Sequence, residues 1–182
     1  RFLLGDIRDE ARLHMAMRGI ETVIHCAALK IVPKCEADPV ECVATNVHGA
    51  ENVIRASINC GVKKVIAIST DKAVQPVNLY GSTKLTAERL FIAANHLSGS
   101  PGGNIDATRF SIVRCGNAAN SRGSVIPLIK KLAAMRLPVT ITDPGMTRFW
   151  ISIDSAVQFV IQCLADMQGG EVFIPRLPAA SV

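Results

Sequence analysis

One stretch sets the architecture expected of this chain: Lys64-Val65-Ile66-Ala67-Ile68-Ser69-Thr70-Asp71-Lys72. Residues 65–68 are continuously apolar, as expected for a strand covered on both faces, and the chain then turns abruptly polar. On either side, short apolar runs alternate with segments of helical period, which is typical of βαβ units and a parallel sheet with helices on both faces. The expected strands are residues 2–4, 22–26, 64–69, 108–113, 139–142 and 172–174.

Four segments have the period of a helix with one apolar face. The clearest covers residues 39–58 and begins directly after Asp38. Inside it, Asn46 and Gly49 are unfavourable helix residues, so we expect structural roles for them in polar bonding and close packing. The other expected helices are a short segment between Asp9 and Gly19, residues 80–96 and residues 153–167.

Composition excludes several classes of protein. A chain of 182 residues that is 49% hydrophobic and 19% charged is expected to fold as one domain around an aliphatic core. The 20 Lys and Arg residues outnumber 15 Asp and Glu residues, a net charge of +5, but they are scattered. This favours a phosphorylated small molecule over nucleic acid as partner. Six cysteines without a C-x-x-C pair indicate reduced thiols and no metal, and no apolar run reaches the length of a membrane span.

Polar residues follow the expected strands. Because ligands of open α/β sheets collect at the carboxyl ends of strands, these residues are expected to line one crevice. The four groups are Gly5-Asp6-Ile7, Ala27-Ala28-Leu29-Lys30, Ser69-Thr70-Asp71-Lys72 and Arg114-Cys115-Gly116-Asn117.

A Tyr-x-x-x-Lys motif, Tyr80 to Lys84, opens the third helical segment. Residues four apart share a helix face, so the Lys84 ammonium is expected to lie beside the Tyr80 phenol and to favour its phenolate. A phenol activated in this way can act as a general base. The motif alone also occurs by chance, and its position eight residues after a polar strand end is what favours chemistry.

Six blocks along the chain carry more information together than any one of them alone. They are Ala27-Ala28-Leu29-Lys30, Ser69-Thr70-Asp71-Lys72-Ala73, Asn78-Leu79-Tyr80-Gly81-Ser82-Thr83-Lys84, Arg114-Cys115-Gly116-Asn117, Ser121-Arg122-Gly123-Ser124 and Met146-Thr147-Arg148-Phe149-Trp150-Ile151. In this order they resemble the extended short-chain dehydrogenase/reductase family. Within it they resemble the inverting UDP-N-acetylglucosamine 4,6-dehydratases of pseudaminic-acid synthesis, which are polysaccharide biosynthesis proteins.

The resemblance implies a Rossmann-like doubly wound parallel sheet, incomplete at the N-terminus, with part of a small substrate-binding region. Family members begin with a strand and a G-x-x-G-x-x-G pyrophosphate loop that this sequence lacks at its start, so we expect the central fragment of such an enzyme. The isolated chain is then expected to be inactive. The expected division is an NADP-binding part over residues 1–120, a substrate-binding segment over 121–150, and a C-terminal helix and strand over 151–182.

The resemblance also assigns the chemistry of a lyase. Tyr80 would take the proton of the sugar 4-hydroxyl while the C4 hydride passes to the nicotinamide. Asp71 and Lys72 would supply the acid and the base for loss of water across C5 and C6, with inversion at C5. Return of the hydride to C6 regenerates the cofactor, expected to be NADP rather than NAD. Thr70 and Lys84 complete the expected catalytic set.

Binding residues are implied in the same way. The cofactor set is Asp6, Ile7, Cys26, Ala27, Lys30, Tyr80, Lys84 and Ala118. The substrate set is Lys30, Asn117, Arg122, Gly123, Ser124, Val125, Ile126, Thr142 and Arg148. The pair Gly123-Ser124, ahead of an apolar helix, offers free backbone amides to an anion, and the guanidinium of Arg148 suits a pyrophosphate.

Structural alternatives remain for single residues. Asp71-Lys72 can be a surface ion pair, Asp6 a plain turn residue and Arg148 a solvated arginine. Trp150 is expected in the core, and the four histidines are expected to pack or to face solvent.

Alternatives also remain for the function. A nucleotide-sugar 4-epimerase would need Tyr80 but no acid–base pair, and a non-catalytic nucleotide-binding module would need neither. We expect a cytoplasmic enzyme of nonulosonic-acid or surface-glycan synthesis, a homo-oligomer at full length. Its expected partner is a UDP-sugar, with no nucleic acid, membrane or metal.

Overall fold

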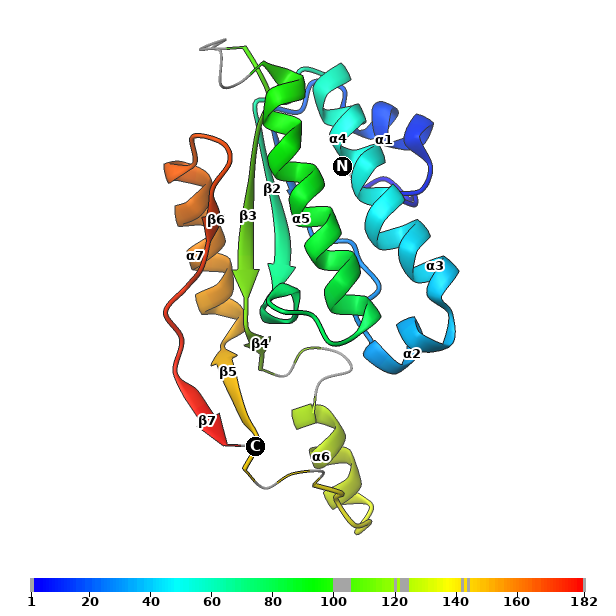
Figure 1. Ribbon diagram of the computed structural model, residues 1–182, viewed down its shortest axis with the longest axis vertical. Helices are drawn as coiled ribbons and strands as arrows, with labels where there is room; N and C mark the ends of the chain where they lie inside the picture. The colour runs from blue at the N-terminus through cyan, green and yellow to red at the C-terminus, as the bar shows by residue number, and fades with distance from the viewer. Residues whose placement is uncertain are drawn as a thin grey trace.

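A four-stranded parallel sheet forms the centre of the molecule. The computed structural model describes residues 2–99, 106–119, 121, 125–141, 143 and 145–181. The strand order is β1-β2-β3-β6, and every neighbouring pair is parallel (Figure 1). The strands are β1 (Thr22–His25), β2 (Lys64–Thr70), β3 (Arg109–Cys115) and β6 (Val172–Phe173). These confirm four of the six expected strands to within two residues at either end.

Alternate side chains of the strands build two cores, because successive residues of a strand point to opposite faces of the sheet. Val65 and Phe110 pack under helices α4 (Gly49–Asn59) and α5 (Leu79–Ser98). On the other face, Ile66 packs with Val113 and with Cys163 of α7 (Ile153–Asp166). Figure 1 shows α4 and α5 on one side of the sheet and α7 apart from them. The expected α/β fold with helices on both faces is confirmed.

The long helix expected over residues 39–58 forms, but its winding changes in the middle. It runs through α3 (Pro39–Val43), the π-helical turn η1 (Ala44–His48) and α4. Gly49 begins α4, where an added Cβ would overlap the side chain of Ile7, so the glycine permits the close packing that the sequence indicated. Asn46 lies in the π turn and is buried.

The other helices have clear local causes. The Asp9 side chain accepts a hydrogen bond from the Arg12 amide and caps α1 (Glu10–Met17). The Asn78 side chain accepts one from Gly81 and caps α5, which ends at Gly99 with a φ of 77°. The helix expected after Ser124 is α6 (Val125–Ala134). The short helices α2 (Val32–Ala37) and η2 (Asp71–Ala73) were not predicted.

A second, three-stranded sheet lies beyond the end of β3. It pairs β4 (Asn117–Ala118) in parallel with β5 (Thr147–Ile151), and β5 antiparallel with β7 (Ala179–Ser181). This sheet joins stretches on both sides of the expected boundaries at residues 120 and 150. Beyond the second boundary, α7 and β6 return to the main sheet.

Two expected strands do not form. Residues 2–4 and the described residues 139–141 are apolar but have no strand conformation, and Phe2 and Leu4 are exposed. A strand needs a neighbour for its backbone hydrogen bonds, and hydrophobicity alone does not supply one. The prediction of a strand over residues 2–4 was therefore wrong, as was that over residues 139–142 for the part that the structure describes, residues 139–141. None of the described helices combines the length and the apolar character that crossing a membrane requires.

Candidate active site

The turn that follows β2 carries the first group of polar residues. Thr70 ends the strand, and its hydroxyl accepts a hydrogen bond from the Lys72 amide at 3.3 Å and donates one to Oδ1 of Asp71 at 2.9 Å. The tight helical turn η2 follows at once. Asp71 and Lys72 are thus held at the carboxyl end of the central strand, as the sequence predicted.

Asp71 and Lys72 form a closed cluster with Asn117. The Lys72 ammonium donates to Oδ1 of Asp71 at 3.0 Å and to Oδ1 of Asn117 at 3.3 Å. The Asn117 amide in turn donates to Oδ2 of Asp71 at 3.3 Å. The side chains of Lys72 and Asp71 are 35% and 27% exposed, so the pair is reachable by a ligand without being a freely solvated surface bridge.

Tyr80 lies in the first turn of α5 and is buried. Burial raises the pKa of its phenol, hydrogen bonding with the Thr70 side chain lowers it, and the charge of Asp71 raises it again. That Lys84 favours the phenolate stays a prediction.

Lys84 points to the sheet. Its ammonium donates a hydrogen bond of 2.7 Å to the carbonyl oxygen of Ile68, the last residue of β2's apolar run. Burial lowers the pKa of Lys84 to about 8, while the charge of Glu88 one helical turn later opposes that shift. This buried ammonium lies close to the strand end, and its hydrogen bond goes to the backbone and not to the phenol.

The loop after β1 is fixed by Asn46. Its side chain accepts from the Leu29 amide at 2.8 Å and donates to the Leu29 carbonyl at 2.9 Å and to Oγ1 of Thr83 at 3.0 Å. Lys30 follows, and its ammonium lies 3.3 Å from Oγ of Ser121. The structural role expected for Asn46 is confirmed by these contacts.

Two adjoining cavities are lined by eight of the fifteen expected site residues that the structure describes. The first has about 270 Å³ and the second about 300 Å³, and Lys30, Lys72 and Asn117 line both. Expected residues that line only the first are Thr70, Tyr80 and Ala118. Expected residues that line only the second are Val125 and Arg148. Two cations and one amide at the junction, together with Arg148 in the second cavity, give these cavities the chemistry of an anion site.

Other expected residues lie elsewhere or outside the described part of the chain. The Asp6 carboxylate is bound by Arg8, whose hydrogen bonds lower the pKa of Asp6 to about 2. Asp6 and Ile7 line a separate cavity of about 140 Å³. Cys26 and Ala27 are exposed after β1, and Ile126 lies in α6. The residues outside the described part are Arg122, Gly123, Ser124 and Thr142.

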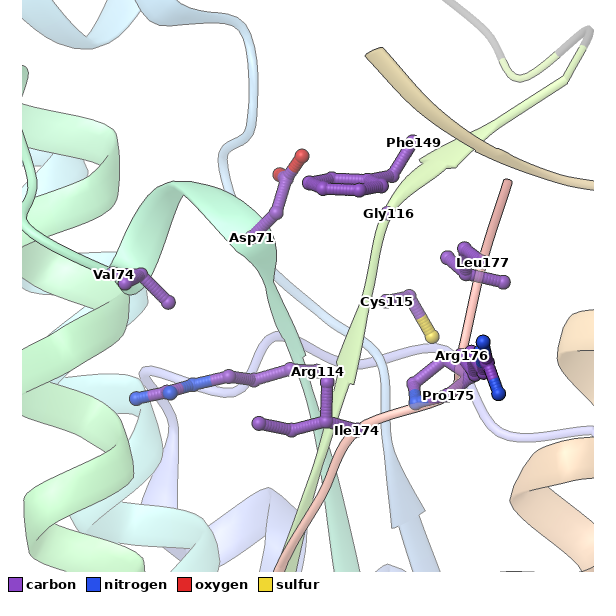
Figure 2. Close-up of a pocket in the computed structure, with 10 residues that line it drawn as sticks. All are labelled: Asp71, Val74, Arg114, Cys115, Gly116, Phe149, Ile174, Pro175, Arg176 and Leu177. Carbon is purple, nitrogen blue, oxygen red and sulfur yellow. The ribbon is translucent and has the colours of Figure 1, made fainter. Parts of the chain in front are cut away.

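A larger cavity, about 410 Å³, opens on the other side of Asp71 and was not predicted (Figure 2). Asp71 is the residue of the cluster that reaches it, and its lining is otherwise mainly apolar. The remaining lining residues are Val74, Arg114, Cys115, Gly116, Phe149, Ile174, Pro175, Arg176 and Leu177.

Sequence reasoning missed an ion pair behind the site. Glu88 of α5 receives two hydrogen bonds from the guanidinium of Arg114, at 2.9 and 2.6 Å, and a further one from the hydroxyl of Ser69. The Glu88 side chain is 4% exposed and that of Arg114 20%. A glutamate on the buried face of a helix, eight residues after Tyr80, was the available signal.

The residues present fit a nicotinamide dinucleotide. Within the described residues, the buried Lys84 ammonium has one hydrogen bond, which leaves donor capacity for ligand hydroxyls. Tyr80 on the same helix lines the first cavity, and the small, exposed Cys26 and Ala27 leave space at the neighbouring strand end. No cluster of metal-ligating side chains occurs in the described part of the chain.

Comparison with known proteins places this geometry in a family. The profile of the polysaccharide biosynthesis protein family matches residues 1–182. The inverting UDP-N-acetylglucosamine 4,6-dehydratase of Campylobacter jejuni subsp. jejuni serotype O:23/36 (strain 81-176) is 52% identical over 185 residues, covering 100% of this chain and 53% of that protein. The UDP-glucose 4-epimerase of Rickettsia akari (strain Hartford) is 42% identical over 182 residues, covering 100% and 52%.

A solved structure gives the same result. The X-ray structure of Pen from Bacillus thuringiensis is similar with a TM-score of 0.93 and 43% identity, covering 100% of this chain and 54% of that one. The chain thus spans about half the length of the curated relatives it matches. The expected family and fold class are confirmed, and the chain belongs to the polysaccharide biosynthesis protein family.

Proposed function

We propose that this protein, at the full length of its relatives, dehydrates UDP-N-acetylglucosamine with NADP as cofactor and with inversion at C5. The observation that carries the proposal is the hydrogen-bonded cluster of Asp71, Lys72 and Asn117. Lys72 and Asn117 line one cavity together with Tyr80, and Asp71 lines the larger cavity that shares Cys115 and Gly116 with it. The relative from Campylobacter supports the choice of substrate and stereochemistry through its name. The reaction belongs to the lyases and would serve nonulosonic-acid or surface-glycan synthesis.

The pair of Lys72 and Asp71 supplies both groups that loss of water requires. Removal of the C5 proton needs a neutral amine, and departure of the 6-hydroxyl needs an acid. Nζ of Lys72 and Oδ1 of Asp71 are 3.0 Å apart in a hydrogen bond. Transfer of one proton along this bond produces the neutral amine and the carboxylic acid together, without an outside proton source.

Tyr80 has the role of accepting the proton of the sugar 4-hydroxyl. When bound, the nicotinamide would accept the hydride from C4 and would later donate it to C6. Because burial raises the pKa of Tyr80, the phenol becomes a base only when further positive charge stands beside it. Lys30 and Arg148 line the second cavity and would hold the phosphates of the nucleotide.

The test uses the full-length protein with NADP and UDP-N-acetylglucosamine. Mass spectrometry is expected to show a product lighter by one water, and NMR in deuterated water to show exchange and inverted configuration at C5. UDP-glucose in place of the substrate is the matched control for sugar selectivity. Equilibrium binding of NADP and NAD to the same protein separates the two cofactors, with NADP expected to bind more tightly.

A second function has support from the epimerase relative in Rickettsia. A 4-epimerase would use Tyr80 and the nicotinamide but would leave the C5 proton and the 6-hydroxyl in place. The Asp71–Lys72 pair would then have no chemical task. A product with the mass of the substrate and altered configuration at C4 alone would decide for this alternative.

A further inference from the structure

The carboxylate of Glu88 is the most enclosed charge near the proposed site. Its side chain is 4% exposed, and each of its oxygens has a partner on the sheet. Oε1 accepts from Ser69 and from Nε of Arg114, and Oε2 accepts from Nη2 of Arg114 at 2.6 Å. A buried carboxylate in a bidentate interaction with a guanidinium group has one preferred position. It can therefore fix the elements to which it is bonded.

Glu88 and its two partners, Ser69 and Arg114, belong to three elements that carry the proposed site. Glu88 follows Lys84 by one turn of α5, and the Lys84 ammonium donates to Ile68 beside Ser69 on β2. The helix is therefore attached to β2 at two consecutive residues. Arg114 extends the attachment to β3, three residues before Asn117.

We propose that Glu88 is a positioning residue: through Ser69 and Arg114 it fixes the helix bearing Tyr80 and Lys84 against the strand ends bearing Asp71 and Asn117. This inference rests on the proposed function, because it gives Glu88 a role in aligning that active site. Glu88 touches neither cavity of the site and acts through its neighbours.

Charge gives Glu88 a second effect on the same helix. Three titratable groups interact electrostatically with Lys84: Glu88 on the same helix, and His25 and Cys26 at the end of β1. Arg114 interacts with Glu88 from β3. Glu88 is the only carboxylate among them. Its removal takes away the charge that opposes the effect of burial on Lys84, which disfavours the ammonium form of Lys84.

The decisive variant is Glu88→Gln in the full-length protein, labelled with ¹³C at the lysine ε-carbons. The Lys84 resonance is assigned by its loss in Lys84→Arg. With Glu88 present, the titration midpoint is expected near pH 8, and Glu88→Gln is expected to lower it by about one pH unit or more. Glu88→Asp keeps the charge and is expected to restore most of the shift.

Kinetics test the alignment itself. Ser69→Ala removes one hydrogen bond to Glu88 and leaves its ion pair with Arg114 in place. This variant is therefore expected to fold even if Glu88→Gln does not. Both variants are expected to lower kcat about tenfold with KM changed less than threefold, since alignment affects the reacting groups more than binding. Asp106→Asn, at an exposed ion pair with Lys63, is the matched control and is expected to keep the parent values.

Two results would overturn the inference. One is a titration midpoint of Lys84 that is unchanged in Glu88→Gln while the melting temperature falls, because this combination indicates a structural role alone. The other is a parental kcat in Ser69→Ala. Failure of the proposed function would show differently, as an absence of dehydrated product from the parent protein, and the NMR titration would still report on Glu88.

Discussion

Nζ of Lys72 and Oδ1 of Asn117 lie 3.3 Å apart although 45 residues separate them in the chain. The contact exists because β2 and β3 run in parallel and end at the same edge of the sheet. Asn117 also donates to Asp71 and to the carbonyl oxygen of Phe149 on β5. One amide side chain thus connects the expected acid–base pair to the second sheet.

Replacing Asn117 with alanine tests this connection. The change removes one acceptor from Lys72 and one donor from Asp71, and a hydrogen bond to a charged group contributes about 1.5–3 kcal/mol. We expect kcat to fall at least tenfold while the melting temperature changes little. Asn59→Ala, at the exposed end of α4, is the control, and equal kinetics in the two variants would contradict the role of Asn117.

Gly81→Ala tests how the helix and the turn fit together. An added Cβ at this position would overlap the carbonyl oxygen of Lys72 and crowd Pro76, both outside the helix. The turn must move, so we expect a loss of about 1–3 kcal/mol in the free energy of unfolding and a large loss of turnover. Ser82→Ala, one residue along the helix, should show neither effect in chemical denaturation and steady-state assays.

His25 makes stability depend on pH. Burial, and after it the charge of Lys84, lowers the pKa of His25 to about 4 from an ordinary value of 6.5. Between these values the unfolded chain binds a proton that the folded chain does not. Stability is therefore fully present above about pH 6.5 and is lost as the pH falls toward 4, by about 3 kcal/mol at most.

The His25→Phe variant removes this titration and keeps a ring beside Phe91, whose centroid lies 5.6 Å from that of His25. Urea unfolding at pH 7 and pH 5 is the measurement. The parent protein should lose more stability between the two pH values than the variant does. Equal losses would show that the acid sensitivity has another source.

The buried ion pair is expected to matter for folding as well as alignment. Arg114→Met leaves the enclosed Glu88 carboxylate without its main partner, and breaking one side of a buried pair costs about 3–5 kcal/mol. Since Arg114 is partly exposed, we expect the lower end of that range in denaturation experiments. A variant as stable as the parent would contradict the assigned geometry.

The sequence predicted the part of the fold that depends on local pattern. The buried run of β2 and the polar residues after it were sufficient to place Asp71 and Lys72 at the carboxyl edge of the sheet. The strand predictions at residues 2–4 and 139–141 were wrong because an apolar run becomes a strand only when a neighbouring strand pairs with it. The short strands β5 and β7 were not predicted for the same reason, because each depends on pairing with residues far away in the sequence.

The placement of a candidate residue was predictable where one element carries it, and less so where two elements must meet. The spacing of Tyr80 and Lys84 placed both on one helix, but the direction of Lys84 toward Ile68 depends on how that helix packs. The pairing of Glu88 with Arg114 joins a helix face to a strand 26 residues later. No sequence spacing rule gives that contact.

Lys72→Ala in the full-length protein tests whether the Asp71–Lys72 pair carries out the dehydration. The variant is incubated with UDP-N-acetylglucosamine and NADP, and the product is measured by mass spectrometry. We expect loss of the dehydrated product by about 10²-fold or more, because a general base is removed, with NADP binding unchanged. Lys34→Ala, an exposed lysine of α2, is the control and should keep full turnover. Formation of the dehydrated product by Lys72→Ala at the parental rate would contradict the account.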